Sequence, residues 1–395
     1  MPHPSCASSC CARLVDGSLL ESPLRVLGPA QGSISHGRSD ILPPHSKESN
    51  LQILITGITG RVGANIARAF IASGHQVRGF VWPGDRQTAK LKILEAEIFE
   101  GDLRSLEDVK AAAEGCDWIF HLGAAFQAGG PFTDEQFFDI NVKGTFNVLE
   151  AAVGLKPKLK HLIFSSTDAT MQKYIPGGIP EPITETSLPL VTTSWYGYSK
   201  ILGEHLIDRY VRADGVPATV FRFAYVWGAG EVLNFPQFKL SHFLKEFGGR
   251  KDADGKATYA ALKRLDNGSE KLVIACDENG RPYKKHCVEV RDLVHAFEAA
   301  AGKPSTYGKT YHVGAPSAFT WDEAVPYLAE KLEMPHARIN IRGAAPTYYE
   351  YDMTAAVRDF AYSPGIDIFK TIDEAIRFER DGGGDLIPAR LGTSG

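Results

Sequence analysis

The chain has 395 residues, 44% of them hydrophobic and 23% charged, which is enough apolar material for one large or two smaller globular cores. Its formal net charge of −4 argues against nucleic-acid binding, which requires a basic surface. No apolar run approaches the roughly 20 residues needed to span a bilayer, so we expect a soluble cytoplasmic protein without a membrane or nucleic-acid partner.

Residues 1–49 are rich in Ser, Pro and Gly and have no sustained hydrophobic periodicity, so we predict a disordered leader. The segment lacks the apolar stretch of a secretory signal, and its acidic residues do not suit a transit peptide. Cys6, Cys10 and Cys11 lie here near His3, but no second pair of ligands has the spacing of a zinc finger. The remaining three cysteines are scattered. We therefore predict reduced thiols and no metal site.

The predicted fold begins with an apolar strand at 51–55 and a helix at 64–73, joined by a turn with three glycines. Gly57 allows the tight turn, Gly60 lets the backbone approach a pyrophosphate, and Gly63 lets the helix pack closely on the strand. The N-terminus of the helix offers free N–H groups and a partial positive charge to phosphates. The turn residues that we assign to a dinucleotide are Gly57, Thr59, Gly60, Arg61, Val62 and Gly63.

Beyond this turn, short apolar segments alternate with amphipathic ones, as in a parallel sheet flanked by helices. This pattern indicates an α/β fold with a doubly wound, Rossmann-type parallel sheet. We assign residues 50–228 and 287–312 to this dinucleotide-binding domain. The predicted strands are 76–81, 96–100, 118–121, 161–165 and 218–223, and the main predicted helices are 106–113, 137–153 and 196–212.

After residue 228 the alternation weakens. A polar, Lys- and Asp-rich stretch at 248–270 indicates a loop-rich insertion, and 320–332 is a further predicted helix. We expect residues 229–286 and 313–385 to form a smaller, C-terminal substrate-binding lobe over the carboxyl edge of the sheet, where ligands bind in such folds.

Tyr196 and Lys200 are four residues apart in a predicted helix, so their side chains share one face. A neighbouring ammonium group and an oxidised nicotinamide would lower the pKa of a tyrosine from its usual value of about 10. Tyr196 could then exchange a proton with a substrate hydroxyl or carbonyl while hydride moves to or from the cofactor. Hydroxyl side chains at 165–167 end a predicted strand and supply a further hydrogen bond to the same oxygen. A chance surface pair is the alternative, but the glycine turn and the hydroxyl-tipped strand precede the pair in the expected order.

Together these motifs resemble the extended short-chain dehydrogenase/reductase family, and within it the NAD-dependent epimerase/dehydratase group. The resemblance implies that Thr167, Tyr196 and Lys200 are catalytic and that Lys200 also holds the nicotinamide ribose. It implies a homodimer formed through the helices at 137–153 and 196–212. Other implied cofactor contacts are Asp102, Leu103, Ala124, Tyr225 and Val226. The segments that carry the resemblance are 56–63, 101–103, 121–125, 141–144, 165–167, 196–200 and 290–292.

Two departures from the family pattern concern the reaction and the cofactor. The family's dehydratases have a Glu after a Thr-Asp pair, whereas Ala169 follows Asp168 here, so dehydration is disfavoured. We assign Asp168 to a turn or to a substrate hydroxyl. The second predicted strand ends without the acid typical of NAD enzymes or the Arg typical of NADP enzymes. We favour NAD without excluding NADP, and we assign Trp82 to the adenine, with an apolar shielding role as the alternative.

A third departure lies where nucleotide-sugar enzymes of the group bind a diphosphate with an Arg. Lys285 occupies this position, and lysine supplies charge without the bidentate fork of arginine. A solvated basic turn is the alternative for Lys285. Asn234 falls where the family lines its substrate nucleotide. The substrate-binding residues that we expect are therefore Asp168, Asn234 and Lys285.

From the sequence we expect an enzyme that oxidises a sugar-type secondary alcohol with NAD. The leading hypothesis is a nucleotide-sugar epimerase, acting on a UDP-sugar-like substrate through a keto intermediate. The alternative is a net NAD(P)-dependent oxidoreductase that acts on a smaller hydroxy or keto substrate. A redox-sensing binding module is a third alternative, which the pair formed by Tyr196 and Lys200 disfavours.

Overall fold

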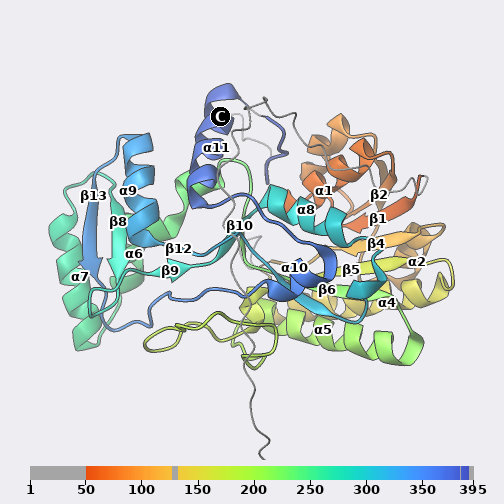
Figure 1. The fold of residues 1–395 in the computed structure, drawn as a ribbon, viewed down its shortest axis with the longest axis horizontal. Coiled ribbons are helices and arrows are strands. Elements are labelled where there is room, and N and C mark those ends of the chain that lie inside the picture. Colours follow the sequence, from red (N-terminus) through yellow and green to blue (C-terminus); the bar gives the residue numbers. More distant parts are fainter. Residues whose placement is uncertain (1–49, 127–131, 383, 391–395) are drawn as a thin grey trace, which may run out of the picture. The chain divides into compact units, whose positions relative to one another are not determined.

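The computed structural model describes residues 50–126, 132–382 and 384–390. The predicted leader, with Cys6, Cys10, Cys11 and His3, lies outside these residues. A seven-stranded parallel sheet has the strand order β11-β6-β5-β4-β1-β2-β3 (Figure 1), which confirms the predicted Rossmann-type α/β fold. Its strands are β1 (Gln52–Thr56), β2 (Gln76–Val81), β3 (Glu97–Glu100), β4 (Trp118–His121), β5 (His161–Thr167), β6 (Ala218–Phe223) and β11 (Thr310–Val313).

Helices cover both faces of this sheet (Figure 1). One face packs against α1 and α8, and the other packs against α2, α4 and α5. Because both faces are covered, the central strands are apolar along their length, which is why the sequence shows them as continuous runs. These helices are α1 (Arg61–Ala72), α2 (Leu106–Ala113), α4 (Gly144–Gly154), α5 (Trp195–Asp214) and α8 (Val290–Ala300). The short α3 (Asp134–Phe137) leads into α4 through a π-helical turn, Phe138–Lys143.

A second hydrophobic core forms a smaller lobe, at the left of Figure 1. Its strands β8 (Leu272–Cys276) and β13 (His336–Asn340) pair in parallel. Two short strand pairs join β7 (Tyr225–Trp227) to β10 (Cys287–Glu289) and β9 (Lys284–Lys285) to β12 (Phe319–Thr320). The helices of this region are α6 (Leu240–Phe247), α7 (Ala253–Leu265), α9 (Trp321–Leu332) and α11 (Ile368–Asp381).

Helix α7 corrects the expectation of a loop-rich stretch at 248–270. Its buried residues, Gly255, Thr258 and Leu262, recur at helical spacing, while the Lys and Asp residues face solvent. Asp252 caps the helix, because its carboxylate accepts a hydrogen bond of 2.7 Å from the backbone N–H of Gly255. This buried face of α7 is hard to recognise in the sequence because, of its three buried residues, only Leu262 is strongly apolar.

The segment that follows β13 returns to the dinucleotide-binding sheet, although we expected 313–385 to lie in the lobe. Tyr349 and Tyr351 belong to the same hydrophobic core as β1, together with Phe360 of α10 (Thr354–Phe360). On the way, Tyr348 makes a β-bridge to Lys284 and Tyr351 makes one to Ile183. The segment therefore ties the lobe to the loop that follows β5.

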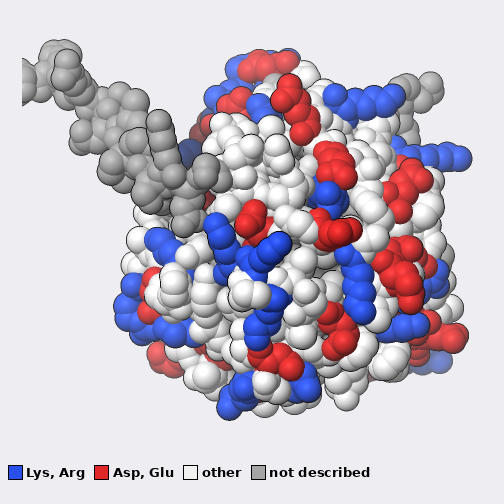
Figure 2. All heavy atoms as spheres, turned by 90° about the vertical axis from the view of Figure 1, so that its right-hand side faces the viewer, with Lys and Arg blue, Asp and Glu red and all other residues white. Residues whose placement is uncertain are grey.

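The surface of the described residues carries both signs of charge. Acidic and basic side chains are interspersed on the face at the right of Figure 1, as Figure 2 shows. No helix in the described ranges is long and apolar enough to cross a membrane.

Candidate active site

The turn between β1 and α1 has the geometry that a dinucleotide phosphate requires. Gly57 has φ = +72°, and a Cβ there would lie 2.7 Å from the backbone nitrogen of Gly123. A Cβ on Gly63 would lie 2.4 Å from the carbonyl oxygen of Gly57, so the helix approaches the turn as closely as only glycine allows. Gly60 is the N-cap of α1 and supplies no side chain to its N–H groups. The turn therefore fits the pyrophosphate of a dinucleotide.

The other predicted residues of this motif lie in the same turn. Thr59 precedes Gly60, and Val62 belongs to the first turn of α1. The side chain of Arg61 leaves the turn and reaches the lobe. Its Nη1 donates a hydrogen bond of 2.7 Å to the carbonyl oxygen of Val226, and its Nη2 lies 3.0 Å from the carboxylate of Glu231. Arg61 thus links the glycine turn to β7.

The predicted adenine contacts Asp102 and Leu103 lie just after β3. Arg104, which we did not predict from the sequence, follows them. The carboxylate of Asp102 accepts a hydrogen bond of 2.9 Å from Nε of Arg104. Although burial raises the pKa of Asp102, this hydrogen bond and the charge of Arg104 outweigh it and lower that pKa overall. The guanidinium lies 5.0 Å from the ring centre of Trp82, which is 51% exposed. Leu103 lies close to Gly123 and Gly144, because a Cβ on these glycines would lie 3.0 Å and 3.1 Å from its side chain.

An asparagine of the π-helical turn connects the loop after β4 to α5. The amide of Asn141 accepts a hydrogen bond of 2.7 Å from the backbone N–H of Ala125 and donates one of 3.0 Å to its carbonyl oxygen. It also donates to the hydroxyl of Ser199 at 2.8 Å. Ala124, a predicted cofactor contact, lies in this loop next to Ala125. Irregular helical turns of this kind often occur at functional sites.

The three predicted catalytic residues come together at the carboxyl end of β5. Tyr196 is half-buried in the first turn of α5, and its phenol makes a side-chain hydrogen bond with Thr167, the last residue of β5. The close approach of α5 to the turn after β5 depends on Gly197, because a Cβ there would lie 2.3 Å from the carbonyl oxygen of Ala169. The ring of Phe126 lies edge-on to Tyr196 with a centroid distance of 5.1 Å.

The charges around Tyr196 differ from the sequence-based expectation. Burial raises the pKa of Tyr196 to about 12. The hydrogen bond from Thr167 and the charge of Arg61 oppose this rise, whereas the charge of Asp168 adds to it. Lys200 is 3% exposed, and its ammonium group donates a hydrogen bond of 2.8 Å to the carbonyl oxygen of Ser165. In the protein alone the pKa of Tyr196 is therefore raised, whereas the lowering that we expected requires an oxidised nicotinamide as well as Lys200.

The three predicted substrate residues do not form one group. Asp168 lies beside Thr167, but its carboxylate is held by Lys173 and Tyr351. Asn234 is exposed, and its side-chain oxygen accepts a hydrogen bond of 2.9 Å from Lys239.

Lys285 lies inside the lobe and is only 2% exposed. Its ammonium donates a hydrogen bond of 2.8 Å to the side-chain oxygen of Gln237. It also lies 4.6 Å from the ring centre of Tyr225 and 5.1 Å from that of Phe235. Burial lowers the pKa of Lys285. This enclosed position does not support the prediction that Lys285 binds a diphosphate, and it excludes the alternative of a solvated turn.

A cavity of about 370 Å³ joins the glycine turn to the lobe. Aromatic rings and the Arg61–Glu231 ion pair dominate its walls, and Glu379 adds a carboxylate. Tyr225, a predicted nicotinamide contact, is 37% exposed and forms part of the wall. The lining residues are Arg61, Tyr225, Trp227, Ala229, Gly230, Glu231, Asn234, Phe235, Pro236 and Glu379. The exposed lining of the cavity is more polar than apolar, and its two carboxylates outnumber its one cation.

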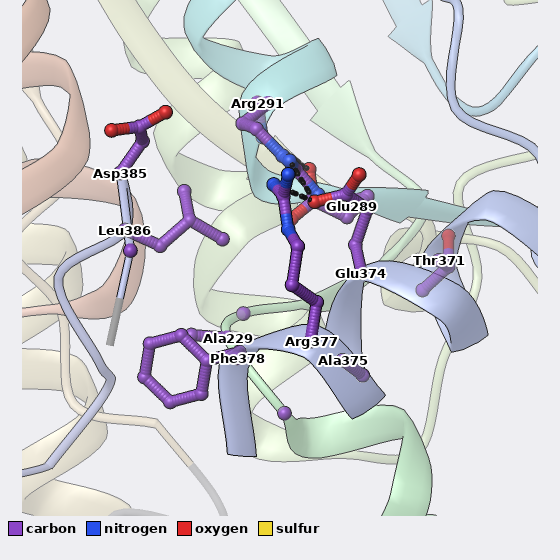
Figure 3. Close-up of a pocket in the computed structure, with 13 residues that line it drawn as sticks. Ala229, Glu289, Arg291, Thr371, Glu374, Ala375, Arg377, Phe378, Asp385 and Leu386 are labelled. Atoms are coloured by element: carbon purple, nitrogen blue, oxygen red, sulfur yellow. Dashed lines mark hydrogen bonds and ion pairs between the residues drawn. The ribbon is translucent and has the colours of Figure 1, made fainter. Parts of the chain in front are cut away.

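A second, much smaller cavity of about 30 Å³ lies where α11 meets β10 (Figure 3). Arg291 pairs there with Glu289 at 3.0 Å and with Glu374 at 2.9 Å, and Arg377 also contacts Glu374. The volume suits roughly one water molecule. This ion-pair network fastens α11 to the dinucleotide-binding domain and offers no room for a substrate.

Comparison with known proteins shows the family of this chain. The family model of the NAD dependent epimerase/dehydratase family matches residues 53–314. The chain is 27% identical over 334 residues to the 2-alkyl-3-oxoalkanoate reductase of Shewanella oneidensis, which covers 80% of this chain and 82% of that protein. It is 29% identical over 229 residues to the 3 beta-hydroxysteroid dehydrogenase/Delta 5-->4-isomerase of Mycobacterium tuberculosis, covering 55% of this chain. The chain spans 56% of the length of that relative.

The fold also matches a solved structure that contains a dinucleotide. A short-chain dehydrogenase/reductase superfamily protein from Agrobacterium tumefaciens, with bound NAD, superposes with a TM-score of 0.71 at 26% identity. The match covers 84% of this chain and 98% of that chain.

Proposed function

Because the chain belongs to the NAD dependent epimerase/dehydratase family, we propose that it is an NAD-dependent oxidoreductase that interconverts a secondary alcohol and a ketone on an apolar carbon skeleton. The observation that carries this proposal is the 370 Å³ cavity, whose walls combine aromatic rings with carboxylates. Its cation, Arg61, is already paired with Glu231 at 3.0 Å. A substrate without phosphate groups suits such walls better than a phosphorylated one does, because the carboxylates outnumber the cation.

The residues of the site can perform the proton transfer of this reaction. NAD, the cofactor of the family, supplies or accepts the hydride when it is bound in the glycine turn. In the reductive direction, the phenol of Tyr196 gives its proton to the oxygen of the former carbonyl group, which becomes the alcohol. The hydroxyl of Thr167 hydrogen-bonds to the same oxygen. Lys200 lies one helical turn from Tyr196, and in its protonated form its positive charge stabilises the phenolate that remains.

The leading sequence-based hypothesis, a nucleotide-sugar epimerase, has less support from the geometry. A sugar nucleotide brings a diphosphate, for which cationic side chains are strong hydrogen-bond partners. Lys285 is enclosed by Gln237 and two aromatic rings, and the carboxylates of Glu231 and Glu379 would repel a diphosphate. The names of the two relatives from Shewanella and Mycobacterium also denote hydroxyl or keto groups on alkanoate or steroid skeletons, and neither name denotes a phosphate.

A substrate panel tests the proposal. The purified full chain is incubated with NAD and a 3β-hydroxysteroid, a long-chain 2-alkyl-3-hydroxyalkanoate or UDP-glucose, while NADH formation and the products are followed. We expect NADH and ketone to form in equal amounts from at least one of the apolar alcohols and not from UDP-glucose. Conversion of UDP-glucose to UDP-galactose without accumulation of NADH would overturn the proposal in favour of an epimerase.

A further inference from the structure

Directly behind Thr167 lies a group of buried polar side chains that the proposed proton transfer does not use. The Asp168 carboxylate, whose side chain is 13% exposed, accepts a hydrogen bond of 3.0 Å from the hydroxyl of Tyr351 at Oδ2. The ammonium of Lys173 lies 3.2 Å from the same oxygen. The other oxygen, Oδ1, accepts a hydrogen bond of 3.4 Å from the hydroxyl of Thr167. We call Asp168, Lys173 and Tyr351 the rear cluster.

Two segments that are distant in sequence build the rear cluster. Asp168 follows β5, and Lys173 lies five residues further on with its side chain 4% exposed. Tyr351 is 183 residues away in sequence, in the segment that returns from the lobe. Burying such a charge pair is costly unless further hydrogen bonds complete it. Lys173 provides one, since its ammonium also donates to the carbonyl oxygen of Asp168 at 2.8 Å.

The rear cluster acts on Thr167 because a threonine hydroxyl has only one proton to donate. If that proton is directed to Asp168, it is withheld from the phenolate of Tyr196 and from the oxygen of a substrate. Lys173 and Tyr351 both bind Oδ2 of Asp168, and their positive charge and hydrogen bond weaken the carboxylate as an acceptor at Oδ1. The cluster thus controls where the Thr167 proton points.

We propose that the rear cluster sets the proton-donating strength of Tyr196, with Asp168 competing for the hydroxyl proton of Thr167 and Lys173 and Tyr351 limiting that competition. The inference rests on the proposed roles of Tyr196 and Thr167. Asp168 is then a positioning residue, and Lys173 and Tyr351 support it. None of the three needs to touch the substrate.

The other groups near Tyr196 fix the expected sign. The charge of Asp168 raises the pKa of Tyr196, and the charge of Arg61 lowers it. Lys200 is one turn along α5 and is bound to Ser165, and Phe126 contributes an uncharged ring. Removing the carboxylate of Asp168 should therefore lower the pKa of Tyr196. Removing the ammonium of Lys173 should raise it, because Asp168 is then left uncompensated.

Direct titration of Tyr196 in the NAD-bound protein tests this inference without requiring turnover. Tyrosinate absorbance is measured against pH for each variant with and without Tyr196→Phe, and the difference reports Tyr196 alone. We expect Asp168→Asn to shift the titration to lower pH by about one unit and Lys173→Met to shift it to higher pH by a similar amount. The double variant should follow Asp168→Asn. Tyr351→Phe should give a smaller upward shift.

Asp277→Asn is the matched control. Asp277 is also a partly buried aspartate held by a cation, since Arg281 lies 3.0 Å from it, but it belongs to the lobe. It should not move the titration of Tyr196. If Lys173→Met does not fold, the opposite shifts of Asp168→Asn and Tyr351→Phe provide the test.

Unchanged titration in Asp168→Asn, or shifts of the same sign in Asp168→Asn and the variants of its partners, would overturn the inference. A purely structural role would lower stability without moving the titration. Opposite shifts in a protein that is inactive on the whole substrate panel would refute the proposed function alone. Activity without the shifts would refute this inference alone.

Discussion

Lys200 in the dinucleotide-binding domain and Lys285 in the lobe are both almost fully buried, yet their surroundings differ. The ammonium of Lys200 donates to a backbone carbonyl at the end of β5, one helical turn from Tyr196. That of Lys285 donates to the side chain of Gln237 and lies near the rings of Tyr225 and Phe235. Both pKa values are lowered, chiefly by burial. Burial of a charge therefore does not by itself identify a catalytic group.

The comparison separates a lysine positioned by the sheet from a lysine enclosed by side chains. The carbonyl of Ser165 belongs to a central strand, so Lys200 is fixed relative to Thr167 at the same strand end. Lys285 is held by the amide of Gln237 and by the rings of Tyr225 and Phe235, both of which line the cavity of the lobe. We expect substitutions around Lys200 at the end of β5 to change the catalytic rate. Substitutions around Lys285 should change that rate little.

The largest effect is expected for Tyr196→Phe. Loss of the phenolic proton should lower kcat by about 10²–10⁴-fold, the usual contribution of general acid–base catalysis. Binding of NADH should remain, because the glycine turn is unaltered, and a fluorescence titration would show this. A variant that retained full activity would show that Tyr196 is not the proton donor and would remove the distinction between the two regions.

A smaller effect is expected for Lys200→Met, and it depends on pH. Burial lowers the pKa of Lys200 to about 7, from 10.5 for an ordinary lysine. As pH rises from 7 towards 10.5, the folded lysine is neutral while the unfolded chain still binds the proton, so the wild type gains stability relative to the variant. The gain is lost again as pH falls through about 7.

Urea unfolding of both proteins across this pH range measures the change. We expect the free energy of unfolding of the wild type to rise relative to Lys200→Met by on the order of 1–3 kcal/mol. A difference that does not vary with pH would mean that Lys200 is not buried as described. Comparing the two proteins at each pH cancels the contribution of groups that they share.

The smallest effect is expected for Lys285→Met. Replacing a buried charge by an apolar side chain of similar length is often neutral for stability, and Tyr225 and Phe235 would pack against Met. We expect kcat/KM for the apolar alcohol to stay within about threefold and the free energy of unfolding within ~1 kcal/mol. A loss as large as that of Tyr196→Phe would instead place Lys285 in contact with substrate and revive the diphosphate hypothesis.

Local spacing in the sequence determined the framework of this protein. Apolar runs predicted the central strands because both faces of the sheet are covered, and the glycine turn was recognisable because Gly57 and Gly63 leave no space for a Cβ. The four-residue spacing of Tyr196 and Lys200 predicted a shared helix face, and the structure places both beside the end of β5. Such features depend on residues that are close together in the chain.

Only the tertiary structure decided the electrostatics of the site. Asp168 meets Tyr351 across 183 residues, and Arg61 meets Glu231 across the boundary with the lobe. No sequence pattern showed that Lys285 would be enclosed or that burial would raise the pKa of Tyr196. The physical reason is that a pKa depends on desolvation and on charges brought close by folding, whereas sequence periodicity specifies only which face of an element a side chain occupies.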